Sequence, residues 1–238
     1  MKTRYFYLAI ILFQSIYTYG QNLTGEQLLN NAIAFHDPQN NWKTFQGKLL
    51  IEMESPKAAL RSTRIELDLP ANYFKSTVKQ NNHIIESELN KEECILKLNG
   101  STTITKKVKD SLRITCDRAQ LMKNYYTYLY GLPMKLKDPG TRIDPKVVKQ
   151  TFKGKEYLVL KVNYEKEVGQ DTWYFYFDPK TYAMEIYQFF HDESKNDGEY
   201  ILLTDLITIH GIQFPKTRAW YYNKDNAYLA TDTLFKAQ

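Results

Sequence analysis

Residues 64–69 read RIELDL, and this short stretch decides what kind of fold the chain adopts. Ile65, Leu67 and Leu69 occupy every second position, with a charged residue before each of them. Because successive side chains of a β-strand point to opposite faces, a period of two predicts a strand with one apolar and one polar face. Antiparallel sheets commonly have one face on the core and one in water. The stretch therefore predicts an antiparallel sheet.

The same alternation extends outward from this strand in both directions. It occurs at residues 45–53, 74–78, 85–89 and 94–98, and between these runs lie short segments with Asn, Gly or Pro. Such spacing is typical of a meander of consecutive hairpins. After residue 147 the pattern returns in segments 148–152, 157–164, 173–177 and 184–190, with further hairpins from about residue 200 onward. We expect about ten antiparallel strands and a mainly β (α+β) fold class.

One strand departs from the alternating pattern. Residues 173–177 read WYFYF and are apolar on both faces. One face of such a strand can line a core or a cavity. The other face is either covered by helices or left partly exposed.

Two segments have helical rather than strand periodicity. Residues 23–28, LTGEQL, contain a capping box with Thr24 as N-cap and Gln27 at the third helical position. The helix that follows ends before Pro38. A second helix is predicted at about residues 116–131, with Asp117 as a candidate cap, and with Gly131 and Pro133 at its end. It is inserted in the meander.

The N-terminus has the composition of an export signal. Residues 1–20 contain Lys2 and Arg4, then an apolar run, then Thr18 and Gly20 at the positions that a signal peptidase requires. We predict cleavage after residue 20, which leaves residues 21–238 as a single domain, exported and soluble. A membrane anchor is the alternative, but the apolar run is shorter than the roughly 20 residues that span a bilayer. No later segment is a candidate for a transmembrane span.

Charge and cysteine content narrow the function further. The formal net charge is +5, and basic residues are interleaved with acidic ones, so nucleic acid is not an expected partner. Cys94 and Cys116 are the only two cysteines. In an exported protein such a pair indicates a disulfide, which would fix the start of the inserted helix to the sheet. Two buried free thiols are the alternative.

The most unusual composition lies in residues 124–140, NYYTYLYGLPMKLKDPG. Its tyrosines surround most of the helix end, whereas docking requires only part of a helix surface to be apolar. Three interpretations remain open: a buried plug, the wall of a lipid-binding cavity, and a surface for stacking sugars. For the second, the candidate ligand-binding residues are Leu121, Met122, Tyr125, Tyr126, Leu129, Met134, Trp173 and Phe175.

Catalytic signatures are absent from the sequence. There is no nucleophile elbow, zinc-protease helix, P-loop or glycine-rich dinucleotide motif. His191, Asp192 and Glu193 are the best alternative, as a metal-assisted hydrolase site. We favour the other interpretation, a polar hairpin loop that runs to residues 196–198. We expect no catalytic residues, no metal and no cofactor.

Three longer runs indicate a family resemblance. Residues 125–141 (YYTYLYGLPMKLKDPGT), 171–200 and 213–225 together resemble an uncharacterised family of secreted bacterial proteins. That family is similar in architecture to the Lol lipoprotein carriers of the periplasm. The resemblance implies a strongly curved antiparallel half-barrel with helices on its concave side and an apolar cavity for acyl chains.

The residues and the resemblance together favour binding over catalysis. We expect a non-enzymatic binding protein for a lipid, an acylated protein or another hydrophobic ligand, located in the periplasm or at the outer membrane. A metal-assisted hydrolase and an envelope protein that interacts with glycans or structural partners are the alternatives.

Overall fold

The structure is a computed structural model that describes residues 23–237. The predicted signal peptide and its cleavage point after residue 20 lie outside the described residues.

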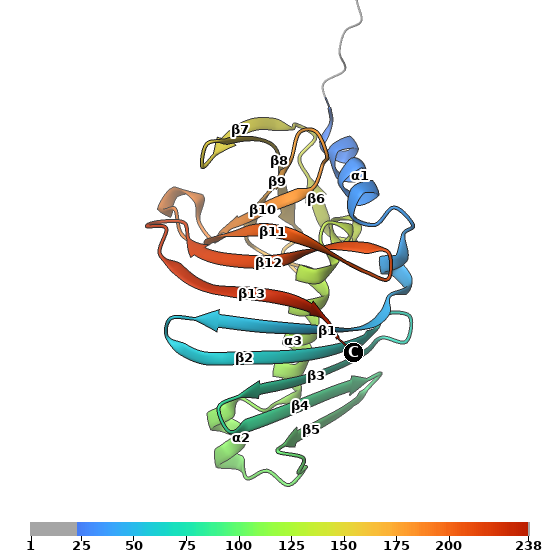
Figure 1. The fold of residues 1–238 in the computed structure, drawn as a ribbon, viewed down its shortest axis with the longest axis vertical. Coiled ribbons are helices and arrows are strands. Elements are labelled where there is room, and N and C mark those ends of the chain that lie inside the picture. Colours follow the sequence, from blue (N-terminus) through green and yellow to red (C-terminus); the bar gives the residue numbers. More distant parts are fainter. Residues whose placement is uncertain (1–22, 238) are drawn as a thin grey trace, which may run out of the picture.

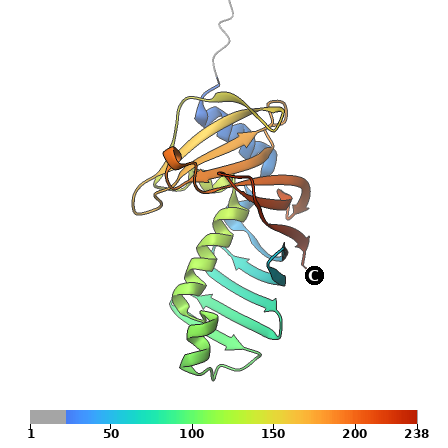
Figure 2. The same ribbon diagram turned by 90° about the vertical axis from the view of Figure 1, so that its left-hand side faces the viewer.

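Thirteen strands form one large antiparallel sheet, which is curved and does not close into a barrel (Figures 1 and 2). This confirms the predicted fold class. The number of strands is higher than the ten or so expected, in part because the shortest has only three residues and too few positions to establish an alternation. The strands are β1 (Gln46–Ser55), β2 (Ala58–Asp68), β3 (Tyr73–Gln80), β4 (His83–Asn90), β5 (Glu93–Leu98), β6 (Thr141–Ile143), β7 (Val148–Phe152), β8 (Lys155–Tyr164), β9 (Thr172–Phe177), β10 (Met184–Phe190), β11 (Glu199–Ile209), β12 (Ile212–Tyr222) and β13 (Tyr228–Lys236).

Strand order follows the chain except at two places, where β1 neighbours β13 and β8 neighbours β6. The sheet runs β5-β4-β3-β2-β1-β13-β12-β11-β10-β9-β8-β6, and β7 pairs with β8. The last strand of the chain therefore lies between β1 and β12 and joins the two halves of the sheet (Figure 1).

Helix α1 (Gly25–His36) begins at the predicted capping box. The backbone N–H of Gln27 donates to the Thr24 hydroxyl, and the backbone N–H of Thr24 donates to the Gln27 side chain. These two bonds satisfy donors that have no partner inside the helix. The helix buries Leu28, Leu29 and Ala32 in the main core.

Helix α3 (Cys116–Gly131) is the predicted inserted helix and extends along the concave side of the sheet (Figure 2). It is preceded by the short exposed helix α2 (Lys106–Leu112). The N-cap of α3 is Thr115, whose hydroxyl accepts from the backbone N–H of Arg118 at 3.1 Å. The prediction of Asp117 as the cap was wrong, because the helix begins before Asp117, which lies in the first turn.

Cys94 of β5 and Cys116 of α3 form a disulfide. The predicted disulfide is therefore confirmed, and the alternative of two free thiols is wrong. The bond attaches the first residue of α3 to the outermost strand on that side of the sheet.

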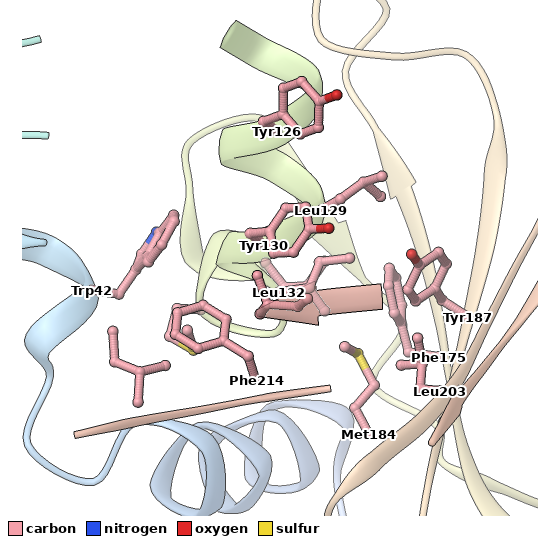
Figure 3. Close-up of a cluster of buried hydrophobic side chains, with 14 of the residues drawn as sticks. Trp42, Tyr126, Leu129, Tyr130, Leu132, Phe175, Met184, Tyr187, Leu203 and Phe214 are labelled. Atoms are coloured by element: carbon pink, nitrogen blue, oxygen red, sulfur yellow. The ribbon is translucent and has the colours of Figure 1, made fainter. Parts of the chain in front are cut away.

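One core cluster lies between α1, α3 and the concave face of the sheet. Figure 3 shows Tyr130 of α3 with Trp42, Phe214 and Tyr187 in this core. Its packing explains why residue 131 is glycine. A Cβ atom there would lie 2.6 Å from Cζ2 of Trp42 and 2.4 Å from Cγ of Lys135, both too close for real contacts.

A second, smaller cluster covers the convex face of β8–β10. It contains Tyr157, Val159, Tyr176 and Ile186, with Phe152 of β7 packed against it. The aromatic rings of Phe152 and Tyr176 are 5.5 Å apart. On the second apolar face of residues 173–177, Tyr176 is therefore covered by Phe152 of β7 and not by a helix, while Tyr174 stays partly exposed.

Candidate functional site

A cavity of about 440 Å³ lies on the concave side, between the C-terminal half of α3 and the sheet. We call it the aromatic cavity. Its volume falls within the roughly 300–1,000 Å³ of typical small-molecule sites. The lining residues are Met53, Tyr125, Tyr128, Leu129, Asp171, Trp173, Phe189, Glu199, Trp220, Leu229, Ala230 and Asp232.

The pairing register of the strands brings together the aromatic side chains that line this cavity. Trp173 of β9 is paired directly with Phe189 of β10, and their rings stack with centroids 4.9 Å apart. Trp220 of β12 is paired with Ala230 of β13. Since directly opposed residues of antiparallel strands place their side chains on the same face, each pair contributes a continuous patch of wall.

Helix α3 contributes the opposite wall. Tyr125, Tyr128 and Leu129 are spaced three and four residues apart, so they lie on one face of the helix. The Tyr128 ring meets the Trp173 ring edge-on at 5.6 Å. The tyrosines of this helix end therefore lie in two environments. Tyr126 and Tyr130 are buried in the core, while Tyr125 and Tyr128 face the cavity.

A second cavity, of about 520 Å³, adjoins the first and shares Tyr128, Asp171 and Trp173 with it. We call it the polar cavity. Its other lining residues are mostly polar or from the loop after β8; they are Asn124, Thr127, Lys135, Asp138, Pro139, Thr141, Tyr164, Glu167, Val168 and Gly169. The hydroxyls of Tyr128 and Tyr164 are hydrogen-bonded to each other, so the polar end of Tyr128 is directed away from the aromatic cavity.

A row of charged residues crosses the concave face beside the aromatic cavity. Arg218 of β12 is paired with Asp232 of β13, Asp232 with Met53 of β1, and Met53 with Arg61 of β2. Asp232 is only 6% exposed, and Oδ2 accepts from Trp220 Nε1 at 3.3 Å. Burial raises the pKa of the Asp232 carboxyl, and the charges of Arg61 and Arg218 oppose this only partly.

Arg218 is also buried, and its guanidinium contacts groups other than the Asp232 carboxylate. Its Nη1 donates to the carbonyl of Pro215 at 2.9 Å, and its guanidinium lies 4.1 Å from the centre of the Tyr130 ring. Such a cation–π contact is stronger when water is excluded. Burial raises the pKa of Tyr130 well above its ordinary value, despite the opposing charge of Arg218.

The candidate residues named from sequence are distributed over three environments. Tyr125, Leu129 and Trp173 line the aromatic cavity. Tyr126, Met134 and Phe175 are buried in the core, with Met122 packed against it. Leu121 lies on the same helix face as Tyr125 and Tyr128, one turn earlier, but it is 52% exposed and does not line the cavity.

Several cavity residues were not found from the sequence. Phe189, Trp220, Met53 and Asp232 come from strands far apart in the chain. No local pattern marks Trp220, because residues 218–222 read RAWYY and do not alternate between polar and apolar side chains.

The residues around His191 do not converge on a common point. His191 Nδ1 lies 2.7 Å from Asp171 Oδ1, whereas Asp192 accepts from Ser194, and Glu193 bonds Lys161 and Tyr174. Between residues 23 and 237, no three His, Cys, Asp or Glu side chains are grouped as metal ligands would be. Within the same residues, no helix has the length and hydrophobicity needed to cross a membrane.

Solved structures with this architecture share little sequence with the chain. A domain from Vibrio parahaemolyticus described as an outer membrane lipoprotein-sorting protein superposes with a TM-score of 0.50 at 12% identity, over 90% of this chain and 92% of that one. A LolA superfamily protein from Nitrosomonas europaea gives 0.49 at 11% identity, over 90% and 92%. A DUF1329 family protein from Desulfovibrio piger gives 0.49 at 8%, over 88% and 90%. The first of these supports a lipoprotein-carrier-like fold for this chain, as predicted.

Sequence comparison places the chain in a family without assigning an activity. No curated protein matches it. A family model described as a family of unknown function (DUF6503) matches residues 2–237, nearly the whole sequence. The chain therefore belongs to the DUF6503 family.

Proposed function

We propose that this protein is a non-enzymatic carrier that binds the hydrocarbon part of a lipid or of an acylated protein in the aromatic cavity. The observation that carries this proposal is the cavity of about 440 Å³ between α3 and the sheet, walled by Trp173, Phe189, Trp220 and Leu129. It is a concave, largely apolar space with few polar groups, as ligand sites generally are.

The binding energy would come from removing hydrocarbon from water. Each buried methylene contributes about 0.8 kcal/mol, so about eight methylenes contribute roughly 6 kcal/mol before the cost of association. The aromatic rings provide large rigid surfaces that lose little conformational entropy on binding. A micromolar Kd corresponds to about 8 kcal/mol, so more than about ten methylenes would have to be buried, which is most of a lipid chain.

The fold and the leader sequence are consistent with this role. The Vibrio parahaemolyticus domain is described as a lipoprotein-sorting protein of the outer membrane, and it has a similar fold. Fold alone does not determine function, so the proposal depends on the cavity. With a signal peptide over residues 1–20, such a carrier would work in the periplasm.

Native mass spectrometry of gently purified protein, together with displacement of a fluorescent fatty-acid probe, tests this proposal. Ala230→Phe places a ring in the cavity, because Ala230 lines it opposite Trp220. Ala59→Phe is the matched control, since Ala59 is exposed on β2 and is not among the residues that line the cavity. We expect Ala230→Phe to weaken probe binding at least about tenfold, the loss expected for an overfilled site.

Two results would contradict the proposal. One is the absence of any co-purified lipid together with no binding of the probe. The other is equal binding by the wild type and both phenylalanine variants, which would place the probe elsewhere on the molecule.

A further inference from the structure

The charged side chains in the aromatic cavity are all of one sign. Among its twelve lining residues are Asp171, Glu199 and Asp232, and no lysine, arginine or histidine. This contrasts with the whole chain, in which 32 lysines and arginines outnumber 27 acidic residues. We call these three side chains the cavity carboxylates.

Asp232 has an unused acceptor at the cavity. Asp232 is only 6% exposed, and its Oδ1 has no hydrogen-bond partner. Arg218 is its direct neighbour on β12, but the guanidinium is engaged by the carbonyl of Pro215 and the ring of Tyr130. Within residues 23–237, no ion pair joins Asp232 to either nearby arginine. A buried oxygen of this kind costs stability unless a donor reaches it.

The other two cavity carboxylates differ in how well they are compensated. Asp171 is paired with His191 at 2.7 Å. Glu199 lies directly opposite Phe189 on the neighbouring strand. Burial raises the pKa of Glu199, and the charge of His191 opposes this only partly. Asp232 and Glu199 are therefore the two acidic groups that an incoming cation would stabilise most.

The aromatic walls favour the same class of ligand. Trp173, Trp220, Tyr125, Tyr128 and Phe189 all line this space. The face of an aromatic ring carries partial negative charge and attracts ammonium groups, most strongly in tryptophan. Rings and carboxylates thus form a site that is apolar and yet electrostatically negative.

We propose that the aromatic cavity selects amphiphiles with a cationic amine head group, whose ammonium lies near Asp232 and Glu199 among the rings of Trp173 and Trp220. This inference rests on the proposed binding of hydrocarbon in the same cavity. An anionic head group would be repelled by the cavity carboxylates, and a neutral one would form no ion pair with them.

Three probes with the same chain and different head groups test the inference: dodecylammonium, dodecanol and dodecanoate. Isothermal titration calorimetry on the full chain, at concentrations below self-assembly, gives their affinities. We expect dodecylammonium to bind about tenfold or more tightly than dodecanol, and dodecanoate more weakly than either, from ion pairing and cation–π contacts.

Charge-removing variants locate the head group. Asp232→Asn and Glu199→Gln keep side-chain shape, and each should lower dodecylammonium affinity by several-fold to about tenfold without changing dodecanol affinity. Glu92→Gln, in the exposed turn after β4, is the control and should change neither. If Asp232→Asn misfolds, dodecanol binding will reveal this, and Glu199→Gln still decides the question.

The outcomes separate the two proposals. If no probe binds, hydrocarbon binding itself is wrong. If dodecanol binds and dodecanoate binds as tightly as dodecylammonium, only the head-group inference is overturned. Unchanged dodecylammonium affinity in both carboxylate variants would also overturn it.

Discussion

At the scale of single residues, His36 illustrates how burial fixes a protonation state. The side chain is fully buried at the end of α1; Nε2 accepts from the backbone N–H of Met184, and Nδ1 contacts the carbonyl of Gln213 at 2.7 Å. This pair of contacts requires a neutral ring with its proton on Nδ1. Burial lowers the pKa of His36 to about 4, with the Gln213 carbonyl opposing the shift.

This shift predicts a loss of stability in mild acid. The unfolded chain binds a proton at His36 below about pH 6.5, whereas the folded chain does not until about pH 4. The free energy of unfolding should therefore fall by about 3 kcal/mol as the pH decreases between these values, and His36 should add no slope outside them.

Urea unfolding at a series of pH values measures this slope. His36→Gln can retain an acceptor for Met184 and should remove most of the slope between pH 6.5 and 4. His83→Gln, on exposed β4, is the matched control and should leave it unchanged. Identical slopes in His36→Gln and the wild type would mean that His36 is not the titrating group.

Gly131 provides a second prediction for a single residue. Alanine is ordinarily better than glycine in a helix by about 1 kcal/mol. Here the added methyl would meet the ring of Trp42, which is buried and packed 5.4 Å from the Phe45 ring. Overpacking costs about 1–3 kcal/mol, and the helix gain offsets about 1 kcal/mol of it, so we expect Gly131→Ala to lower the free energy of unfolding by up to about 2 kcal/mol.

Urea denaturation compares this variant with Gly169→Ala. The nearest atom to a Cβ at position 169 is 3.6 Å away, an ordinary contact, so that variant should stay within about 0.5 kcal/mol of the wild type. A stabilised Gly131→Ala would imply that Trp42 moves easily.

At the scale of elements, α3 is held at both ends. The Cys94–Cys116 disulfide fixes its start to β5. Its other end is held by Gly131 against Trp42 and by the buried residues Leu132 and Met134. The wall of the aromatic cavity that α3 provides is therefore fixed in position relative to the sheet.

Removing the disulfide should destabilise the protein measurably. The bond closes a loop with a sequence separation of 22 residues. In the chain-entropy model this corresponds to about 3 kcal/mol. We expect the variant carrying Cys94→Ser and Cys116→Ser to lose about this amount in urea unfolding, and a reducing agent to produce the same loss in the wild type.

Hydrogen exchange would show where the loss occurs. Amides in the first turns of α3 and in β5 should exchange faster in the serine variant, while those of β11 and β12 should change least. An unfolding free energy within about 0.5 kcal/mol of the wild type would contradict the constraint.

The elements also indicate what the sequence could and could not predict. The capping box of α1 and the alternation of residues 64–69 are local, and both gave the correct element. The cap of α3 was misplaced by two residues, because Thr115 and Asp117 both suit that role. The aromatic cavity was only partly predicted, since Trp220, Asp232 and Met53 meet through the register of β1, β12 and β13, which no local pattern specifies.

At the scale of the whole molecule, ligand binding should be linked to stability. A ligand that binds only the folded state at 100 times its Kd adds about 2.7 kcal/mol. For a chain of this size that corresponds to a rise in Tm of roughly 5–10 °C. We expect dodecanol to raise the Tm of the wild type by such an amount in a calorimetric scan.

Two variants serve as comparisons for this measurement. Ala59→Phe should respond to dodecanol as the wild type does, whereas Ala230→Phe should show little rise. Equal shifts in all three would mean that the ligand binds outside the aromatic cavity.

The position of β13 has a consequence for the order in which the molecule can be assembled. The strand that joins β1 to β12 is formed by residues 228–236, and it follows every other strand along the chain. Until a ribosome has made these residues, the segments around it have exposed edges and no shared partner. The aromatic cavity, which Leu229, Ala230 and Asp232 of this strand help to line, is therefore complete only after these residues have been made.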